Sequence, residues 1–151
     1  MNVQRSSVAA LERDPDLRAL LAEYAAESAI TGLPAPAARM DSYRELEGRR
    51  LLQVLSATHE GRLVGFLTLL APVLPHYGVA VAVSESFFVA RAHRGTGAGL
   101  KLLRAAEDMA RHAGSPGLLV SAPFEGDLFK VLPRVGYAET SRVFFKKVGD
   151  A

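Results

Sequence analysis

The chain contains no cysteine, and this absence excludes several kinds of chemistry at once. A disulfide framework, a thiolate nucleophile and a zinc site with cysteine ligands all require that side chain. The chain has only four histidines, and none of them stands at H-x-x-x-H or H-E-x-x-H spacing. We therefore predict that the protein has no metal site.

Long apolar runs and a strong charge of one sign are also lacking. The longest apolar run, roughly residues 63–74, is too short to span a bilayer. The first residues contain no apolar stretch of signal-peptide length before Asp14 and Asp16. We therefore expect a cytoplasmic protein with no membrane partner. The net charge of +2 at pH 7 is nearly balanced and does not by itself imply a nucleic-acid partner, and we expect none.

The composition is that of one globular domain. The 151 residues are 49% hydrophobic and 23% charged, which suffices for a single core. No linker, internal repeat or low-complexity segment divides the chain. We therefore treat residues 1–151 as one domain.

Helix signals dominate the first third of the chain. Asp14 and Pro15 predict a helix start, as the N-cap and the first helical residue. Apolar residues then recur on one helical face until Gly32 ends the helix. A second, weaker helix is expected over residues 41–49.

Strand signals follow. Two strand-like runs, 51–59 and 62–72, are joined by the hairpin signal Glu60-Gly61. A third run covers 79–90, and its polar members cluster at Ser84, Glu85 and Ser86. The remaining elements expected are a helix at 97–113, a strand at 118–122, a short helix at 127–135 and a final strand at 137–148. This order predicts a mixed α/β domain around one twisted sheet.

The stretch 89–100, VARAHRGTGAGL, follows a strand and opens a helix. Successive backbone N–H groups and the helix dipole form an anion site there, and glycine lets the backbone approach a phosphate. Basic side chains surround the loop: Arg91, His93, Arg94, Lys101 and Arg104. The ligand is therefore predicted to be a phosphate or a pyrophosphate.

Two common phosphate motifs do not fit this loop. A Walker A loop needs Ser or Thr after its lysine, but Leu102 follows Lys101. A dinucleotide fingerprint needs a third glycine where Leu100 stands. The pattern [QR]-x-x-G-x-[GA] does fit, as RGTGAG at residues 94–99.

That pattern resembles the acyl-coenzyme A pyrophosphate loop of the GNAT superfamily of N-acyltransferases. Val89, five residues before Arg94, matches the valine at the end of the family's strand, and RVGY at 134–137 resembles its signature before the last strand. The order of elements also matches over 14–148. The resemblance therefore covers nearly the whole chain.

The resemblance implies an α+β fold, with a mainly antiparallel twisted sheet, flanking helices and two central strands that splay apart. The pantetheine arm of acetyl-CoA would lie in the gap, where a backbone N–H would hold the thioester carbonyl. The coenzyme-binding residues implied are Phe88, Val89, Arg94, Gly95, Thr96, Gly97, Ala98, Gly99 and Leu100.

The activity implied is N-acetyl transfer by direct attack of an amine, with no covalent enzyme intermediate. Glu85 is the only acid in its strand, and it stands four residues before Val89, where the family often has an acidic residue. It is therefore a candidate proton acceptor, although it could equally face solvent or pair with an arginine. His76 and Tyr77 are secondary catalytic candidates on the loop 72–78.

One position departs from the family. Many members carry a tyrosine four residues before the glycine of the final signature, and it protonates the departing thiolate. Leu132 occupies that place here, followed by Pro133. One alternative is that Tyr77, Ser121 or water protonates the thiolate instead. The other is that the chain is a coenzyme-binding or protein-interaction module with little catalysis.

The acceptor implied is an amine of a small molecule or of a protein. The segments 31–40 and 72–78 are expected to shape its pocket. Both are mostly apolar, which favours a modest pocket over an acidic trough for polycationic substrates. A homodimer is compatible with the resemblance, and the apolar run 143–145 would supply either its interface or part of the core.

Overall fold

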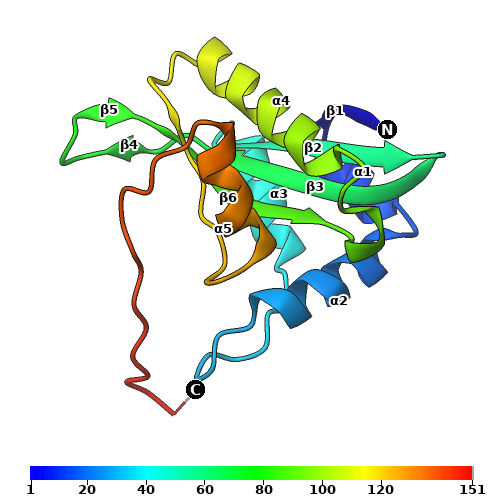
Figure 1. The fold of residues 1–151 in the computed structure, drawn as a ribbon, viewed down its shortest axis with the longest axis horizontal. Helices are drawn as coiled ribbons and strands as arrows, with labels where there is room; N and C mark the ends of the chain where they lie inside the picture. The colour runs from blue at the N-terminus through cyan, green and yellow to red at the C-terminus, as the bar shows by residue number, and fades with distance from the viewer. Residues whose placement is uncertain (151) are drawn as a thin grey trace.

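A twisted five-stranded sheet forms the centre of the computed structural model, which describes residues 1–150 (Figure 1). The strands stand in the order β1-β2-β3-β6-β7. Their bounds are Asn2–Ser6 for β1, Leu52–His59 for β2, Arg62–Leu70 for β3, Ala82–Val89 for β6 and Leu118–Leu119 for β7. The first four are antiparallel, and β7 joins β6 in parallel. This arrangement confirms the predicted mixed α/β class.

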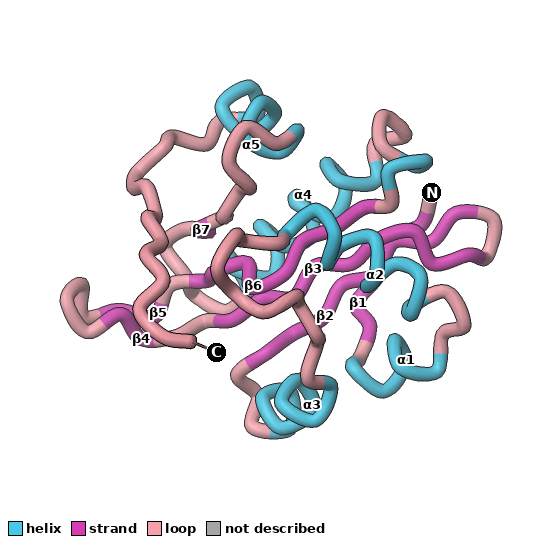
Figure 2. Tube along the Cα trace, turned by 90° about the horizontal axis from the view of Figure 1, so that it is seen from below, coloured by secondary structure: helices cyan, strands magenta, loops and turns pink. Residues whose placement is uncertain are grey.

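Helices cover both faces of the sheet. One face carries α4 (Ala98–His112), and the other carries α1 (Val8–Arg13), α2 (Leu17–Ser28) and α3 (Met40–Gly48). The neighbours Phe66 and Leu67 on β3 show the division, because Phe66 belongs to the α1–α2 core and Leu67 to the α4 core. Figure 2 shows α3 and α5 (Asp127–Val131) on opposite sides of the strands.

The beginning of the chain differs from the prediction. Residues 2–13 form β1 and α1, neither of which was expected, and the side chain of Ser7 caps α1 by accepting from the Ala10 N–H at 3.0 Å. Asp14 does not start the following helix. Its carboxylate accepts from the Asp16 N–H at 2.9 Å in the turn between the two helices, and Asp16 is the N-cap of α2. The Asp-Pro signal therefore marked a turn between helices.

The expected strand at 79–90 is divided into two. Its first part is β5 (Val79–Ala80), which pairs with β4 (Val73–Leu74). These two strands form a separate hairpin that projects from the main sheet (Figure 1). Val81 belongs to neither strand, and its N–H donates to the carbonyl of Pro72 at 3.1 Å. Only the rest of the run, β6, belongs to the main sheet.

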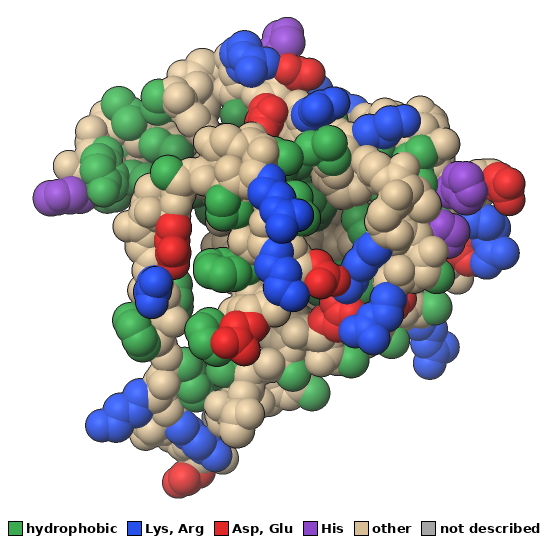
Figure 3. Space-filling view, viewed as in Figure 1, with side chains coloured by type: hydrophobic (Ala, Val, Ile, Leu, Met, Phe, Trp, Pro, Cys, Tyr) green, Lys and Arg blue, Asp and Glu red, His purple; other side chains and the backbone are tan. Residues whose placement is uncertain are grey.

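The end of the chain contains less regular structure than expected. The strand predicted at 118–122 is reduced to β7, and the helix predicted at 127–135 is α5 followed by a 3₁₀ turn at Leu132–Val135. The final strand predicted at 137–148 is wrong, because residues 137–150 form no ladder with the sheet. Figure 3 shows an opening between this C-terminal segment and the rest of the molecule.

The apolar side chains of this segment are not in the core. Val143 is 95% exposed, Phe144 89% and Val148 93%. Phe145 is less exposed, and its ring lies against Gly32 in the segment after α2. The alternative that the run 143–145 packs into the core is therefore excluded.

Candidate active site

Strands β6 and β7 separate after only two paired positions. Their ladder joins Ala82 to Leu118 and Val83 to Leu119, and no later pair follows within residues 1–150. From Ser84 to Val89, the edge of β6 that faces away from β3 therefore has no strand partner. This is the splay that the resemblance implied.

The backbone of β6 presents alternate residues to the gap. The Ala90 N–H donates to the Val64 carbonyl at 2.8 Å, toward β3. Because the backbone groups of successive strand residues point to opposite sides, those of Phe87 and Val89 face the gap. Phe88 turns its backbone toward β3, and its ring is buried against Tyr24 at a centroid distance of 5.0 Å. The structure thus places Val89 at the opening and Phe88 in the core beside it.

The glycine loop leads from this strand into α4. Gly95 and Gly97 have φ values of +85° and +88°, and a Cβ at either would meet nothing within 4 Å. Backbone conformation therefore requires glycine at both positions, while the space beside them is open. Gly99 has an ordinary helical backbone, and a Cβ there would lie 3.8 Å from Val89 Cγ2.

The N-terminus of α4 has no capping side chain. Gly97 is the N-cap and makes no side-chain cap hydrogen bond. The N–H groups of Ala98, Gly99 and Leu100, in the first turn, have no acceptor within the helix. The Thr96 hydroxyl donates to the His93 carbonyl at 2.6 Å and so closes the loop. These donors and the positive end of the helix dipole favour an anionic ligand.

Arg94 does not extend from the loop as a free charge. Its Nε donates to the Val89 carbonyl at 3.0 Å, and its Nη2 donates to Glu27 at 2.6 Å. The guanidinium also lies 5.3 Å from the centroid of the Phe88 ring. The hydrogen bond with Glu27 raises the pKa of Arg94 above its ordinary value. Arg94 therefore holds the loop against β6 and α2, a contact with no signal in the sequence.

Glu85 stands at a β-bulge. Ser84 pairs with Leu69 and Ser86 with Thr68, so Glu85 is the extra residue on β6. In an unbroken strand, Glu85 and Ser86 would face opposite sides of the sheet. The bulge turns both side chains to the α1–α3 face, where they line the same pocket.

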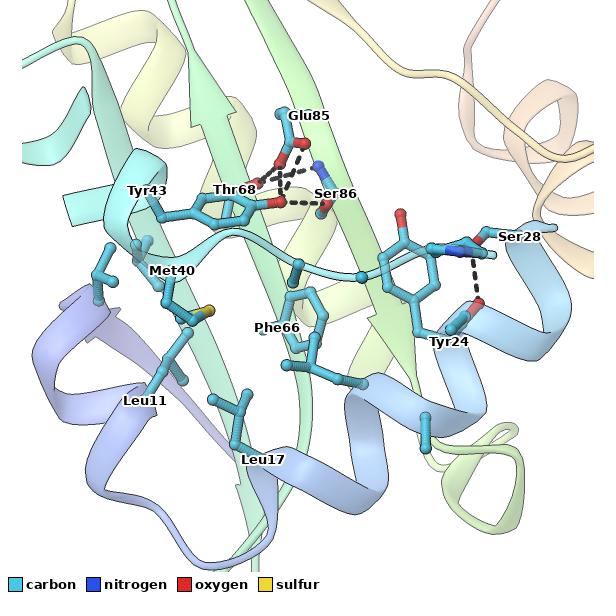
Figure 4. A pocket seen from close by; sticks show the side chains of 18 residues that line it. Leu11, Leu17, Tyr24, Ser28, Met40, Tyr43, Phe66, Thr68, Glu85 and Ser86 are labelled. Carbon is cyan, nitrogen blue, oxygen red and sulfur yellow. Dashed lines mark hydrogen bonds between the residues drawn. The ribbon is translucent and has the colours of Figure 1, made fainter. Parts of the chain in front are cut away.

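Two hydroxyl groups hold the Glu85 carboxylate (Figure 4). The Tyr43 hydroxyl lies 3.0 and 2.9 Å from its two oxygens, and Thr68 Oγ1 donates to it at 2.8 Å. The Ser86 N–H in turn donates to Thr68 Oγ1 at 3.0 Å. Burial raises the pKa of Tyr43 to about 12, and the charge of Glu85 acts in the same direction. Glu85 thus has neutral hydroxyl partners, and the arginine pairing left open above is not observed.

Tyr43 and Thr68 were not predicted from the sequence as residues of the site. Thr68 is the one hydroxyl residue in the apolar strand β3, and that contrast could have marked it. Tyr43 lies on α3, 42 residues before Glu85, and nothing local in the sequence joins the two.

The pocket containing Glu85 is an open cavity of about 480 Å³ between α1, α2, α3 and the sheet. Residues 36–38 and Met40 line it, as expected for the segment before α3. The other expected segment, 72–78, contributes nothing to its lining. His76 and Tyr77 are on the β4–β5 hairpin instead, with their rings in contact and Tyr77 73% exposed. The structure does not bring either of them to Glu85.

The end of the chain contacts α4 through a side chain of the RVGY signature. The Tyr137 hydroxyl donates to Glu107 at 2.7 Å, and burial together with this hydrogen bond raises the pKa of Tyr137 above its ordinary value. Leu132, five residues earlier, is buried. Ser121, which follows β7, is exposed.

Two features are absent from residues 1–150. No group of three or more His, Cys, Asp or Glu side chains is arranged to hold a metal ion. None of the helices described combines the length and the apolar character needed to cross a membrane.

The model of the acetyltransferase (GNAT) family matches residues 16–124. The chain belongs to the GNAT acetyltransferase family. This membership confirms the resemblance drawn from the glycine loop and the prediction of a GNAT-type N-acetyltransferase.

Solved structures show the same fold over nearly the whole length of this GNAT chain. A ribosomal-protein-alanine N-acetyltransferase from Brucella melitensis biovar Abortus 2308 has a TM-score of 0.74 at 21% identity, covering 98% of this chain and 99% of that one. The aminoglycoside acetyltransferase meta-AAC0020, from an uncultured soil metagenomic sample, has a TM-score of 0.72 at 20% identity, covering 99% and 96%.

A third structure was determined with coenzyme. The aminoglycoside N-acetyltransferase AAC(6')-Iy, in complex with CoA, has a TM-score of 0.73 at 19% identity and covers 98% of this chain and 99% of that one. A search of curated proteins found no match. At these identities the structural matches establish the fold alone.

Proposed function

We propose that the protein transfers the acetyl group of acetyl-CoA to a primary amine of a small molecule or a protein. The observation that supports this most directly is the free edge of β6 from Ser84 to Val89, next to the uncapped N-terminus of α4. Acetyl-CoA is the donor that the GNAT family uses.

The residues present fit that coenzyme. The first-turn N–H groups of α4, together with Gly95 and Gly97, would bind the pyrophosphate, because no side chain there occupies the space in front of the backbone. The N–H groups of Phe87 and Val89 face the gap, where one of them would stabilise negative charge on the thioester oxygen.

Glu85 would accept the proton of the attacking amine. The amine nitrogen attacks the thioester carbon, the C–N bond forms, the C–S bond breaks and CoA leaves as the thiolate. The surplus proton of the amine passes to Glu85, directly or through water. Tyr43 and Thr68 fix the orientation of the carboxylate. No cysteine takes part in direct attack, so the cysteine-free composition is consistent with it.

Leu132 supports a second candidate function. It is buried and offers no proton donor at the place where many family members have a tyrosine. The thiolate of CoA is a tolerable leaving group, so water can protonate it and slow transfer would still proceed. Without such transfer, the chain would be a coenzyme-binding module.

Two measurements separate these functions. Calorimetry should show binding of acetyl-CoA, and free thiol should be released from acetyl-CoA faster in the presence of a panel of primary amines than in their absence. Binding without amine-dependent thiol release would favour the coenzyme-binding module. Failure to bind acetyl-CoA would overturn both.

A further inference from the structure

The lining of the Glu85 pocket indicates the kind of amine it accepts. Its walls are apolar side chains, among them Leu11, Leu17 and Met40, and Glu85 is the only charged residue in the lining. The polar groups Tyr43, Thr68 and Ser86 gather around that carboxylate (Figure 4). Away from this end the lining is mainly apolar, and the other residues there that carry a hydroxyl are Tyr24 and Ser28, whose own hydroxyl donates to the Tyr24 carbonyl at 2.8 Å.

The neighbouring acids offer no second anionic partner. Glu12 on α1 pairs with Arg44 at 2.5 Å, and Glu27 on α2 pairs with Arg91 and Arg94. Two further acids lie outside the lining of the cavity: Glu47 on α3, which accepts from the Val8 N–H at 3.1 Å, and Glu23 on α2, which accepts from the Arg91 N–H at 2.8 Å. The second ammonium of a diamine would lie against the apolar walls, which is costly, or reach the open edge beside Ala22, where no residue of the lining carries a carboxylate.

Size and shape agree with a small apolar ligand. About 480 Å³ lies within the range of cavities that hold small molecules. Tyr24 and Phe66 form an aromatic wall, with ring centroids 5.8 Å apart and planes at 74°. Glu85 stands two residues beyond Val83, the last residue of β6 that pairs with β7. A nitrogen held there would be at the mouth of the gap between the strands.

We propose that the acceptor is a primary monoamine with an apolar body, such as an alkylamine or an arylalkylamine. The nitrogen would bind at Glu85, and the body would lie between α1, α2 and the sheet. This inference rests on the proposed function, because it names the acceptor of that same site.

The test compares hexylamine with 1,6-diaminohexane, which has the same chain and a second ammonium group. We expect kcat/KM to favour hexylamine by tenfold or more, and to rise about fourfold with each methylene from butylamine to hexylamine. Calorimetry on the CoA-loaded protein should give the same order of affinities without any turnover.

Matched variants locate the effect in this pocket. Ala22 lines its exposed edge, whereas Ala26, one turn further along α2, does not line it. Ala22→Asp supplies a second carboxylate and should raise kcat/KM for 1,6-diaminohexane relative to hexylamine by about fivefold. Ala26→Asp should leave that ratio unchanged. Equal shifts in the two variants would overturn the assignment of the pocket.

The outcomes distinguish this inference from the proposed function. If amines are acetylated but 1,6-diaminohexane, kanamycin or peptide N-termini are preferred to hexylamine, the proposal of an apolar monoamine acceptor is overturned. The proposed transferase activity then stands. If no amine is acetylated but the CoA-loaded protein binds hexylamine more tightly than the diamine, the pocket assignment stands and the transferase fails. If hexylamine does not bind the CoA-loaded protein, the inference is overturned.

Discussion

At the scale of single residues, Glu85 is the group on which the proposed chemistry depends most. Its position in the strand could be recognised in the sequence, because no other acid occurs in residues 79–90. The direction in which its side chain points could not be recognised there. An extra residue in one strand of an antiparallel pair reverses the side-chain alternation beyond it, and here that bulge lies at Glu85 itself.

Replacing Glu85 by Gln should lower kcat by about 10²-fold if it removes the proton acceptor. The loss should shrink as the pH rises, because more of the acceptor amine is then already neutral. Steady-state rates from pH 6 to 10 would measure this. Affinity for acetyl-CoA should not change, and Glu60→Gln, at the exposed β2–β3 turn, is the matched control. Full activity of Glu85→Gln at every pH would contradict a role as base.

The raised pKa of Tyr43 predicts that the free energy of unfolding depends on pH. Its pKa is raised from the ordinary 10 to about 12 in the folded protein. Between these values the unfolded chain loses the proton and the folded chain keeps it, so stability falls as the pH rises through this window. Denaturant unfolding at pH 9 to 12 should show a shallower fall for Tyr43→Phe. Tyr137→Phe is the parallel case, since the pKa of Tyr137 is raised too. Parallel curves for wild type and Tyr43→Phe would contradict the assignment.

At the scale of elements, the loop between β6 and α4 is the part that the sequence predicted best. Three glycines, a preceding strand and an amphipathic helix are local features, and local features can be recognised without a structure. Gly95 and Gly97 indeed adopt the left-handed conformation that favours glycine. The direction of Arg94 was not predictable, because Glu27 lies 67 residues away.

A matched pair of glycines tests the loop. Gly97→Asp should abolish binding of acetyl-CoA, because it adds a carboxylate where the pyrophosphate approaches the N-terminus of α4. Gly114, just beyond the other end of the same helix, also has a positive φ and open space around it. Gly114→Asp therefore introduces similar backbone strain and should leave binding intact. Calorimetry measures affinity, and thermal unfolding confirms that both variants fold. Unchanged affinity in Gly97→Asp would remove the loop from the site.

At the scale of the whole molecule, the C-terminal segment, residues 137–150, is a part whose apolar side chains remain largely exposed. A strand was expected at 137–148, but the structure leaves Val143, Phe144 and Val148 exposed. Propensity alone does not make a strand, because each strand needs a partner edge. The ladder of β7 extends only to Leu119.

A homodimer therefore remains a prediction, and this segment is where it can be tested. Covering Val143, Phe144 and Val148 with a second copy would remove from water the most exposed apolar side chains in residues 137–150. Sedimentation should show a dimer of the wild type and a shift toward monomer for Phe144→Ser. The matched control is Phe124→Ser, since Phe124 is 92% exposed but lies outside the segment. A wild type that stays monomeric at all concentrations would contradict the prediction.

Features that depend on neighbours along the chain could be predicted from the sequence: the β2–β3 hairpin, the glycine loop and, through the loop, the family. Which side chains meet across the fold could not be predicted, because it depends on packing between elements far apart in the chain. The Glu85 carboxylate accepts hydrogen bonds from Tyr43 on α3 and Thr68 on β3. Side chains of α1 and α2 form apolar walls of the pocket. The two hydrogen bonds of Glu85 join residues 42 and 17 positions apart, and they arise from the bulge in β6 and the packing of three helices on one face of the sheet.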